Sequence, residues 1–116
     1  KVDIVLVGHS HVYERTAPLR GHFGINDTFD ASKQVVATEK SPNHYLVGKN
    51  GQGVIYIVNG SGGKLGGRQK GFPLKSAVYT NTEIGGSMIL DVSKSKLDAK
   101  WLAADGQIRD QFIIEK

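Results

Sequence analysis

The chain has 116 residues, a net charge of +4 at pH 7, 39% hydrophobic and 22% charged residues, and no cysteine. This composition is typical of an ordinary globular protein of at most one domain, and it excludes disulfides and thiolate metal sites. No apolar stretch approaches the length of a membrane span, and the basic residues are too dispersed for a nucleic-acid surface. We therefore predict neither a membrane nor a nucleic acid as a partner.

The chain opens on its first predicted strand. Residues Val2 to Val7 are apolar and β-branched almost throughout, which predicts a strand that is buried on both faces. Lys1 precedes this strand directly, with no initiator Met and no signal peptide. We therefore expect the chain to be a piece of a longer protein.

The middle of the chain gives a weaker signal. Proline and glycine interrupt the pattern from Glu14 to Gln52, so we predict a long loop there, with a short strand near Gln34 to Ala37. Gly53 to Val58 is the second clear strand. The glycine-rich loop from Asn59 to Gly63 follows it, and either lets its backbone approach a substrate or forms a turn that needs positive φ angles.

The last part of the chain predicts an antiparallel three-stranded meander. A short strand at Ala77 to Thr82 is an option before it, and Asp105-Gly106 is a strong hairpin signal within it. Apolar residues alternate around Trp101, which places that side chain in the core. The three strands are predicted at Ser87 to Val92, Leu97 to Ala103 and Ile108 to Ile114.

Gly8-His9-Ser10-His11 is the segment that most suggests chemistry. Two histidines at positions i and i+2 of an extended backbone point the same way. They follow a buried strand, and ligands collect beyond the carboxyl ends of strands in open α/β sheets. Imidazole is also the commonest metal ligand. On these residues alone, the pair indicates either half of a metal site or ordinary polar structure.

The surrounding block supports the first alternative. Residues 2 to 15, Val-Asp-Ile-Val-Leu-Val-Gly-His-Ser-His-Val-Tyr-Glu-Arg, resemble the last signature block of the calcineurin-like metallophosphoesterases, in the form found in purple acid phosphatases. The resemblance implies a β-rich α/β fold. Residues 1–116 would form a single partial domain, the C-terminal half of a sandwich of two mixed sheets flanked by helices, most of which are missing.

The resemblance also implies a metal-dependent phosphoric ester hydrolase. In that family two metal ions, iron paired with zinc, manganese or a second iron, bridge a hydroxide that attacks the phosphate. His9 and His11 would each bind a different metal ion. Tyr13, Glu14, Arg15 and Asn59 would lie beside the ligands or the substrate, and Arg15 would either orient a ligand or pair with Glu14. The resemblance further implies a secreted or periplasmic location.

Much of the family's site is absent from this sequence. The other signature blocks should precede Val2, and two histidines are fewer than the three protein ligands of a typical catalytic zinc site. We therefore assign no catalytic residue here and expect the isolated chain to be inactive, with its metals bound weakly or not at all. Its partners would be a phosphate ester and the missing N-terminal half. The alternative is a β-rich binding or interaction module with an incidental histidine pair; exposed strand edges favour self-association in either case.

Overall fold

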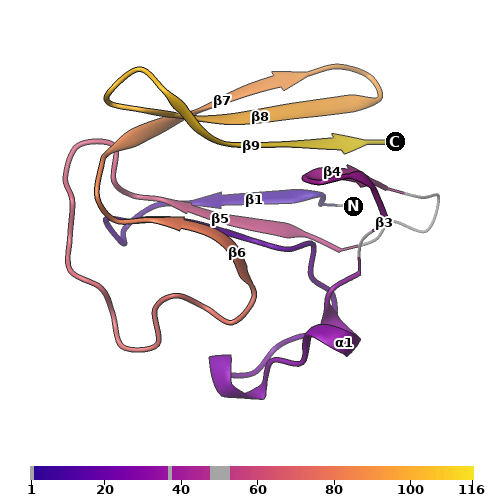
Figure 1. The fold of residues 1–116 in the computed structure, drawn as a ribbon. Helices are drawn as coiled ribbons and strands as arrows, with labels where there is room; N and C mark the ends of the chain where they lie inside the picture. The colour runs from indigo at the N-terminus through magenta and orange to yellow at the C-terminus, as the bar shows by residue number, and fades with distance from the viewer. Residues whose placement is uncertain (1, 37, 48–52) are drawn as a thin grey trace.

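Two facing β-sheets make up the protein (Figure 1). The structure is a computed structural model and describes residues 2–36, 38–47 and 53–116. The first sheet has four strands in the order β1-β5-β2-β6. Their bounds are β1 Ile4–Val7, β2 Tyr13–Thr16, β5 Ile55–Asn59 and β6 Ala77–Asn81.

The second sheet has five strands in the order β3-β4-β9-β8-β7. Each sheet is mixed, because β1 and β5 are parallel in the first, β4 and β9 are parallel in the second, and the remaining pairs are antiparallel. This arrangement confirms the predicted sandwich of two mixed sheets. The strand bounds are β3 Thr38–Ser41, β4 His44–Leu46, β7 Gly86–Val92, β8 Lys96–Ala103 and β9 Ile108–Glu115.

The C-terminal meander is formed as its sequence predicts. Strands β7, β8 and β9 pair antiparallel in chain order. The β8–β9 hairpin turns at Asp105-Gly106, where Gly106 has a φ of 82° that favours glycine. On β8 every second residue from Ala99 to Ala103 is buried, because successive side chains of a strand point to opposite faces of the sheet.

The hydrophobic core lies between the two sheets. Trp101 on β8 is fully buried, as predicted, and stacks on Tyr13 of β2 with ring centroids 4.4 Å apart and planes at 17°. Such offset aromatic pairs add to the burial of apolar area. The other buried residues of this core come from both sheets and are Tyr45, Ile55, Ile57, Ala99, Ala103, Phe112 and Ile114.

Helices contribute little to the described part of the chain. A 3-10 turn, η1 (Asn26–Thr28), and one short helix, α1 (Ala31–Gln34), lie beside the first sheet, on the side away from the second sheet (Figure 1), and neither contains a buried residue. The Asp30 side chain caps α1 by accepting the backbone N–H of Ser32. None of the helices in the described ranges has the length and apolar character needed to cross a membrane.

The long predicted loop contains short elements of its own. Gln34 belongs to α1, and Val35 forms only an isolated bridge with Leu19, so the predicted strand near Gln34 to Ala37 is wrong. Residues 31–34 form the helical turn that the Asp30 side chain caps, and the strand of this region, β3, begins at Thr38. Residues 37 and 48–52 of the predicted loop lie outside the described residues.

β1 lies at the edge of the first sheet, and its burial differs from the prediction. Val2, Leu6 and Val7 are 56%, 47% and 49% exposed, so the strand is not covered on both faces by the described residues. Among these residues β1 pairs only with β5, which leaves its other edge open. The apolar sequence predicted burial correctly only for the N-terminal end of the strand, where Ile4 packs against the core.

Candidate functional site

The histidine pair lies in a tight double turn at the carboxyl end of β1, which we call the His turn (residues 8–12). The N–H of Ser10 bonds to the carbonyl of Gly8 at 3.0 Å, and the N–H of Val12 bonds to the carbonyl of Ser10 at 2.8 Å. Bonds between residues i and i+2 define consecutive three-residue turns. His9 and His11 are therefore the central residues of two successive γ-turns.

The backbone of the His turn is strained at His9. His9 has a φ of 72°, the value of the γ-turn type that is rare and strained. A non-glycine residue in this region costs about 1–2 kcal/mol. The prediction that both histidines occupy an extended backbone is therefore wrong: the chain reverses between them, and each side chain leaves from the apex of its own turn.

Neither imidazole of the His turn is engaged by the rest of the described chain. His9 is exposed and His11 is partly exposed, and the histidine rings that form hydrogen bonds within the described ranges are those of His22 and His44. Within the same ranges, no group of three or more His, Asp or Glu side chains is arranged to hold a metal ion. The turn thus presents two ring donors without completing a site around them.

Two glycines of the loop that follows β5 support the His turn. β1 and β5 are parallel, so their carboxyl ends meet at one edge of the sheet. A Cβ atom on Gly60 would lie 2.0 Å from the carbonyl oxygen of Ser10, and one on Gly66 would lie 2.8 Å from the Cβ of His11. The Gly66 N–H also bonds to the carbonyl of His11 at 3.1 Å. Close approach, and not a positive φ, is what requires glycine at position 60.

The side chains of Tyr13 and Arg15 point into the space between the two sheets. The Arg15 guanidinium donates to Asp110 on β9 through Nε at 2.7 Å and through Nη2 at 2.9 Å. The Tyr13 hydroxyl donates to the same carboxylate at 2.9 Å. The guanidinium also donates to the Tyr45 hydroxyl and to the Asn43 side chain. We call this set of side chains the Arg15 network; it ties β2 to the second sheet.

The Arg15 network is buried and electrostatically coupled. Arg15 is 1% and Asp110 is 7% exposed. Burial would lower the pKa of Arg15, but its hydrogen bonds and charge interaction with Asp110 outweigh burial and raise it. Burial, together with the charge of Asp110 and the hydrogen bond to it, raises the pKa of Tyr13. Arg15 therefore stays cationic and Tyr13 neutral, and Arg15 pairs with Asp110 and not with Glu14.

Sequence reasoning missed Asp110. It occupies the inward-facing position in the β9 alternation Asp110, Phe112, Ile114, all three of which are buried. When a carboxylate occupies a position of the strand alternation that otherwise holds core residues, it predicts a buried ionic partner. Asn59, predicted to lie beside the substrate, accepts a hydrogen bond from the Trp101 indole at 3.1 Å. Its side chain is thus held towards the core, while its role towards a substrate stays a prediction.

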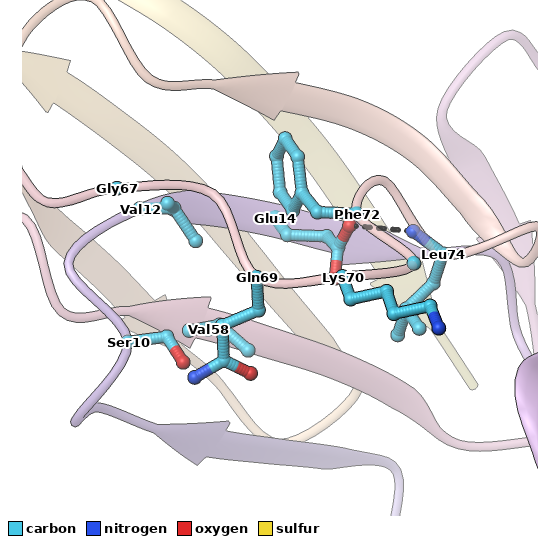
Figure 2. A pocket seen from close by; sticks show the side chains of 10 residues that line it. Ser10, Val12, Glu14, Val58, Gly67, Gln69, Lys70, Phe72 and Leu74 are labelled. Carbon is cyan, nitrogen blue, oxygen red and sulfur yellow. Dashed lines mark hydrogen bonds between the residues drawn. The ribbon is translucent and has the colours of Figure 1, made fainter.

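Glu14 points to the opposite face of β2 from Tyr13 and Arg15. It is 5% exposed because the loop that precedes β6 covers it, and its Oε2 accepts the Leu74 backbone N–H at 2.9 Å (Figure 2). Burial raises the pKa of this carboxyl above its ordinary value of 4.5, and the Leu74 hydrogen bond only partly opposes that rise. Glu14 is thus a buried acid near the His turn.

We expect Glu14→Gln to stabilise the protein at pH 7 relative to the wild type. The folded-state pKa of Glu14 is raised, so protonation of this carboxyl stabilises the folded protein relative to the unfolded chain. This stabilisation is fully present below pH 4.5 and is lost as the pH rises through the folded-state pKa. Glutamine keeps an oxygen for Leu74 and has no charge to bury. Urea unfolding midpoints of both proteins at pH 4 and pH 7 test this. A difference that does not grow with pH would contradict it.

The fold is that of the C-terminal part of a metallophosphoesterase-type sandwich. A solved structure of the purple acid phosphatase PPD1 from seeds of yellow lupin (Lupinus luteus) matches 98% of the chain with a TM-score of 0.69 and 28% identity. The chain covers 18% of that protein. No protein-family model matches the chain.

Two curated relatives match the whole chain. It is 28% identical over 117 residues to the probable inactive purple acid phosphatase 1 of Arabidopsis thaliana, and 30% identical over 118 residues to a nucleotide pyrophosphatase/phosphodiesterase of Hordeum vulgare. The chain spans 17% and 28% of the length of these two proteins. These matches confirm the resemblance to purple acid phosphatases that residues 2 to 15 indicate.

Proposed function

We propose that the protein that carries this chain hydrolyses phosphate esters at a centre of two metal ions, and that phosphomonoesters are its preferred substrates. His9 and His11 would each supply one ligand, to a different metal ion. The His turn carries this proposal: a strained backbone holds two unengaged imidazoles at the carboxyl end of a parallel strand. The phosphatase and phosphodiesterase relatives support it.

The donors of the His turn suit the metals of this proposal. Imidazole is a suitable ligand for iron and zinc ions. Strain in a backbone is retained where the surrounding structure enforces it. The described residues offer these two donors but no complete set of ligands. We therefore place the remaining ligands in an N-terminal half of the catalytic domain, beyond the 116 residues of this chain.

The open edge of β1 is where we expect that half to dock. Leu6 and Val7 expose apolar surface there, and β1 has a partner on one side only within the described ranges. Exposed strand edges associate readily. Docking at this edge would bring further ligands next to the His turn, which directly follows β1.

The proposed reaction adds water to phosphorus and breaks the bond between phosphorus and the ester oxygen. Net, an ester and water give an alcohol and phosphate. Bound metal ions would offset the charge of the phosphate and provide the nucleophile. The chain itself contributes by holding two imidazoles in place, with Gly60 and Gly66 packed against the turn that carries them. We further place the protein outside the cell or in the periplasm, by its similarity to purple acid phosphatases.

A second candidate is a non-catalytic binding or interaction module. The name of the Arabidopsis relative describes a probable inactive phosphatase, and the described residues lack a complete metal site. In this case the Arg15 network would preserve the fold while the His pair had no metal role. Metal binding by the His turn distinguishes the two candidates.

We expect the chain to bind zinc and manganese weakly at neutral pH, and His9→Ala/His11→Ala to abolish this binding. A metal ion competes with protons for an imidazole ligand, so the binding should weaken as the solution is acidified. Calorimetric titration measures both effects. In the longer protein the double change should lower hydrolysis of 4-nitrophenyl phosphate at least about 100-fold, since even residues that only orient ligands are worth 10–100-fold.

His22→Ala is the matched control for the titration. His22 lies in an exposed loop and bonds to Thr28, so its loss should leave the heats of binding unchanged. Equal heats from the double variant and the wild type would remove the metal role from the His turn and favour the interaction module.

A further inference from the structure

A pocket lies beside the His turn, on the outer face of the first sheet. Its floor is formed by β2 and β5, and its roof by the loop that leads to β6 (Figure 2). The volume is about 210 Å³, which is smaller than the pockets that hold drug-sized ligands. We call it the Glu14 pocket. Its lining includes Ser10, Val12, Glu14, Val58, Lys70 and Phe72.

The Glu14 pocket combines apolar walls with one buried carboxylate. Val12 and Val58 project from the strand side, and Phe72 projects from the loop (Figure 2). Glu14 lies between them, and Leu74 donates to its Oε2. A carboxylate in such surroundings is unfavourable unless a donor or a cation approaches it. The pocket thus favours a ligand with an apolar body that carries one positively charged or hydrogen-bonding group.

The protein does not supply that cation from the residues that the structure describes. The ion pairs in those ranges all involve other carboxylates, for example Asp110 with Arg15 and Glu83 with Arg68. Lys70 also lines the pocket, but its side chain is exposed. Its charge opposes a cationic ligand without neutralising Glu14. Within the described ranges Glu14 is thus held by the Leu74 N–H alone, which leaves a place for a cationic ligand at its carboxylate.

The pocket is continuous with the His turn through Ser10. Ser10 stands between His9 and His11 in the chain and is one of the residues that line the pocket. A molecule seated against Val12 and Val58 consequently touches the turn that carries both imidazoles. A group attached to that molecule could extend towards the histidines.

We propose that the Glu14 pocket binds a primary ammonium group carried on a single apolar ring, with the ammonium group paired to Glu14. We further assign to it the part of a phosphate ester that leaves as the alcohol, an assignment that rests on the proposed hydrolysis at the His turn. The substrate class is then a monoester of a small aromatic alcohol that bears an amine. The small volume limits the ligand to one ring.

Binding of benzylamine to the metal-free chain tests the pocket itself. Benzyl alcohol is the matched neutral probe, and amide shifts of Gly67, Gln69 and Gly71 report occupancy because these residues line the pocket. We expect benzylamine to bind at least about tenfold more tightly than benzyl alcohol at pH 7.5, because one hydrogen bond to a charged group contributes that much affinity. Glu14→Gln should remove this preference, while Lys70→Gln should increase it.

Two results would overturn the pocket assignment: equal affinities of the two probes in the wild type, or a preference that survives Glu14→Gln. His9→Ala/His11→Ala should leave the preference intact, so failure of metal binding does not affect this measurement. In the metal-loaded longer protein, kcat/KM for 4-(aminomethyl)phenyl phosphate should exceed that for phenyl phosphate at least about tenfold. Equal values, with benzylamine binding intact, would overturn the assignment of the pocket to the leaving group. No hydrolysis of either ester would overturn the proposed function, and the pocket assignment would then be decided by the comparison of benzylamine with benzyl alcohol.

Discussion

Asp110→Ala should lower the free energy of unfolding by about 3–5 kcal/mol, because it leaves the buried Arg15 guanidinium without its counter-charge. Asp110 accepts two hydrogen bonds from Arg15 and one from Tyr13, and Arg15 is 1% exposed. Small domains have a total stability of about 5–15 kcal/mol, so the loss would be a large part of it. Urea unfolding followed by tryptophan fluorescence measures it, since Trp101 is the only tryptophan in the chain.

Glu83→Ala is the control for this prediction. Glu83 also pairs with an arginine, Arg68, at 3.7 Å, but both side chains are largely exposed. Exposed pairs contribute about 0–1 kcal/mol, so this variant should unfold close to the wild type. Asp110→Asn keeps an acceptor without the charge and should fall between the two. A loss below about 1 kcal/mol in Asp110→Ala would show that the two sheets hold together without the Arg15 network.

Gly60→Ala should displace the His turn and abolish metal binding by it. The added Cβ would lie 2.0 Å from the Ser10 carbonyl oxygen and 2.7 Å from its carbon, and both are backbone atoms that no side-chain rotation can move aside. Overpacking of this kind typically costs 1–3 kcal/mol. We expect a stability loss of about 2 kcal/mol, together with loss of the zinc and manganese heats seen for the wild type.

Gly63→Ala is the matched control, three residues further along the same loop. A Cβ there would have no neighbour within 4 Å, and Gly63 has no positive φ. Its stability and metal binding should equal those of the wild type or slightly exceed them. Unchanged metal heats in Gly60→Ala would mean that the His turn does not depend on contact with the β5 loop.

The strands of the meander could be predicted because local patterns determine them. Alternation around Trp101 and the Asp105-Gly106 hairpin signal place β8 and β9 within one residue of their observed bounds. Burial of β1 could not be predicted in the same way. Apolar residues at Leu6 and Val7 indicate a strand that some surface can cover, but the sequence of one strand does not say which segment covers it.

The candidate site was predictable in composition and not in geometry. The His9 and His11 positions stand out from the sequence, but their γ-turns depend on Gly60 and Gly66, which lie about 50 residues further on. The same holds for Arg15. Its neighbour Glu14 is the obvious partner in the sequence, yet alternation along β2 sends the two side chains to opposite faces. Asp110 becomes the partner only once the sheets have stacked.

The position of β9 in the second sheet has a consequence for the order of synthesis. β9 follows the other eight strands in the described part of the chain, yet it lies between β4 and β8 in the middle of its sheet. The carboxylate that neutralises Arg15 follows it by 95 residues. Until Asp110 emerges, Arg15 has to remain hydrated, so the two sheets can close on each other only after β9 has been synthesised. The nascent segment would therefore expose the inner faces of its sheets until β9 has emerged, and such exposed surface favours aggregation of partly folded chains.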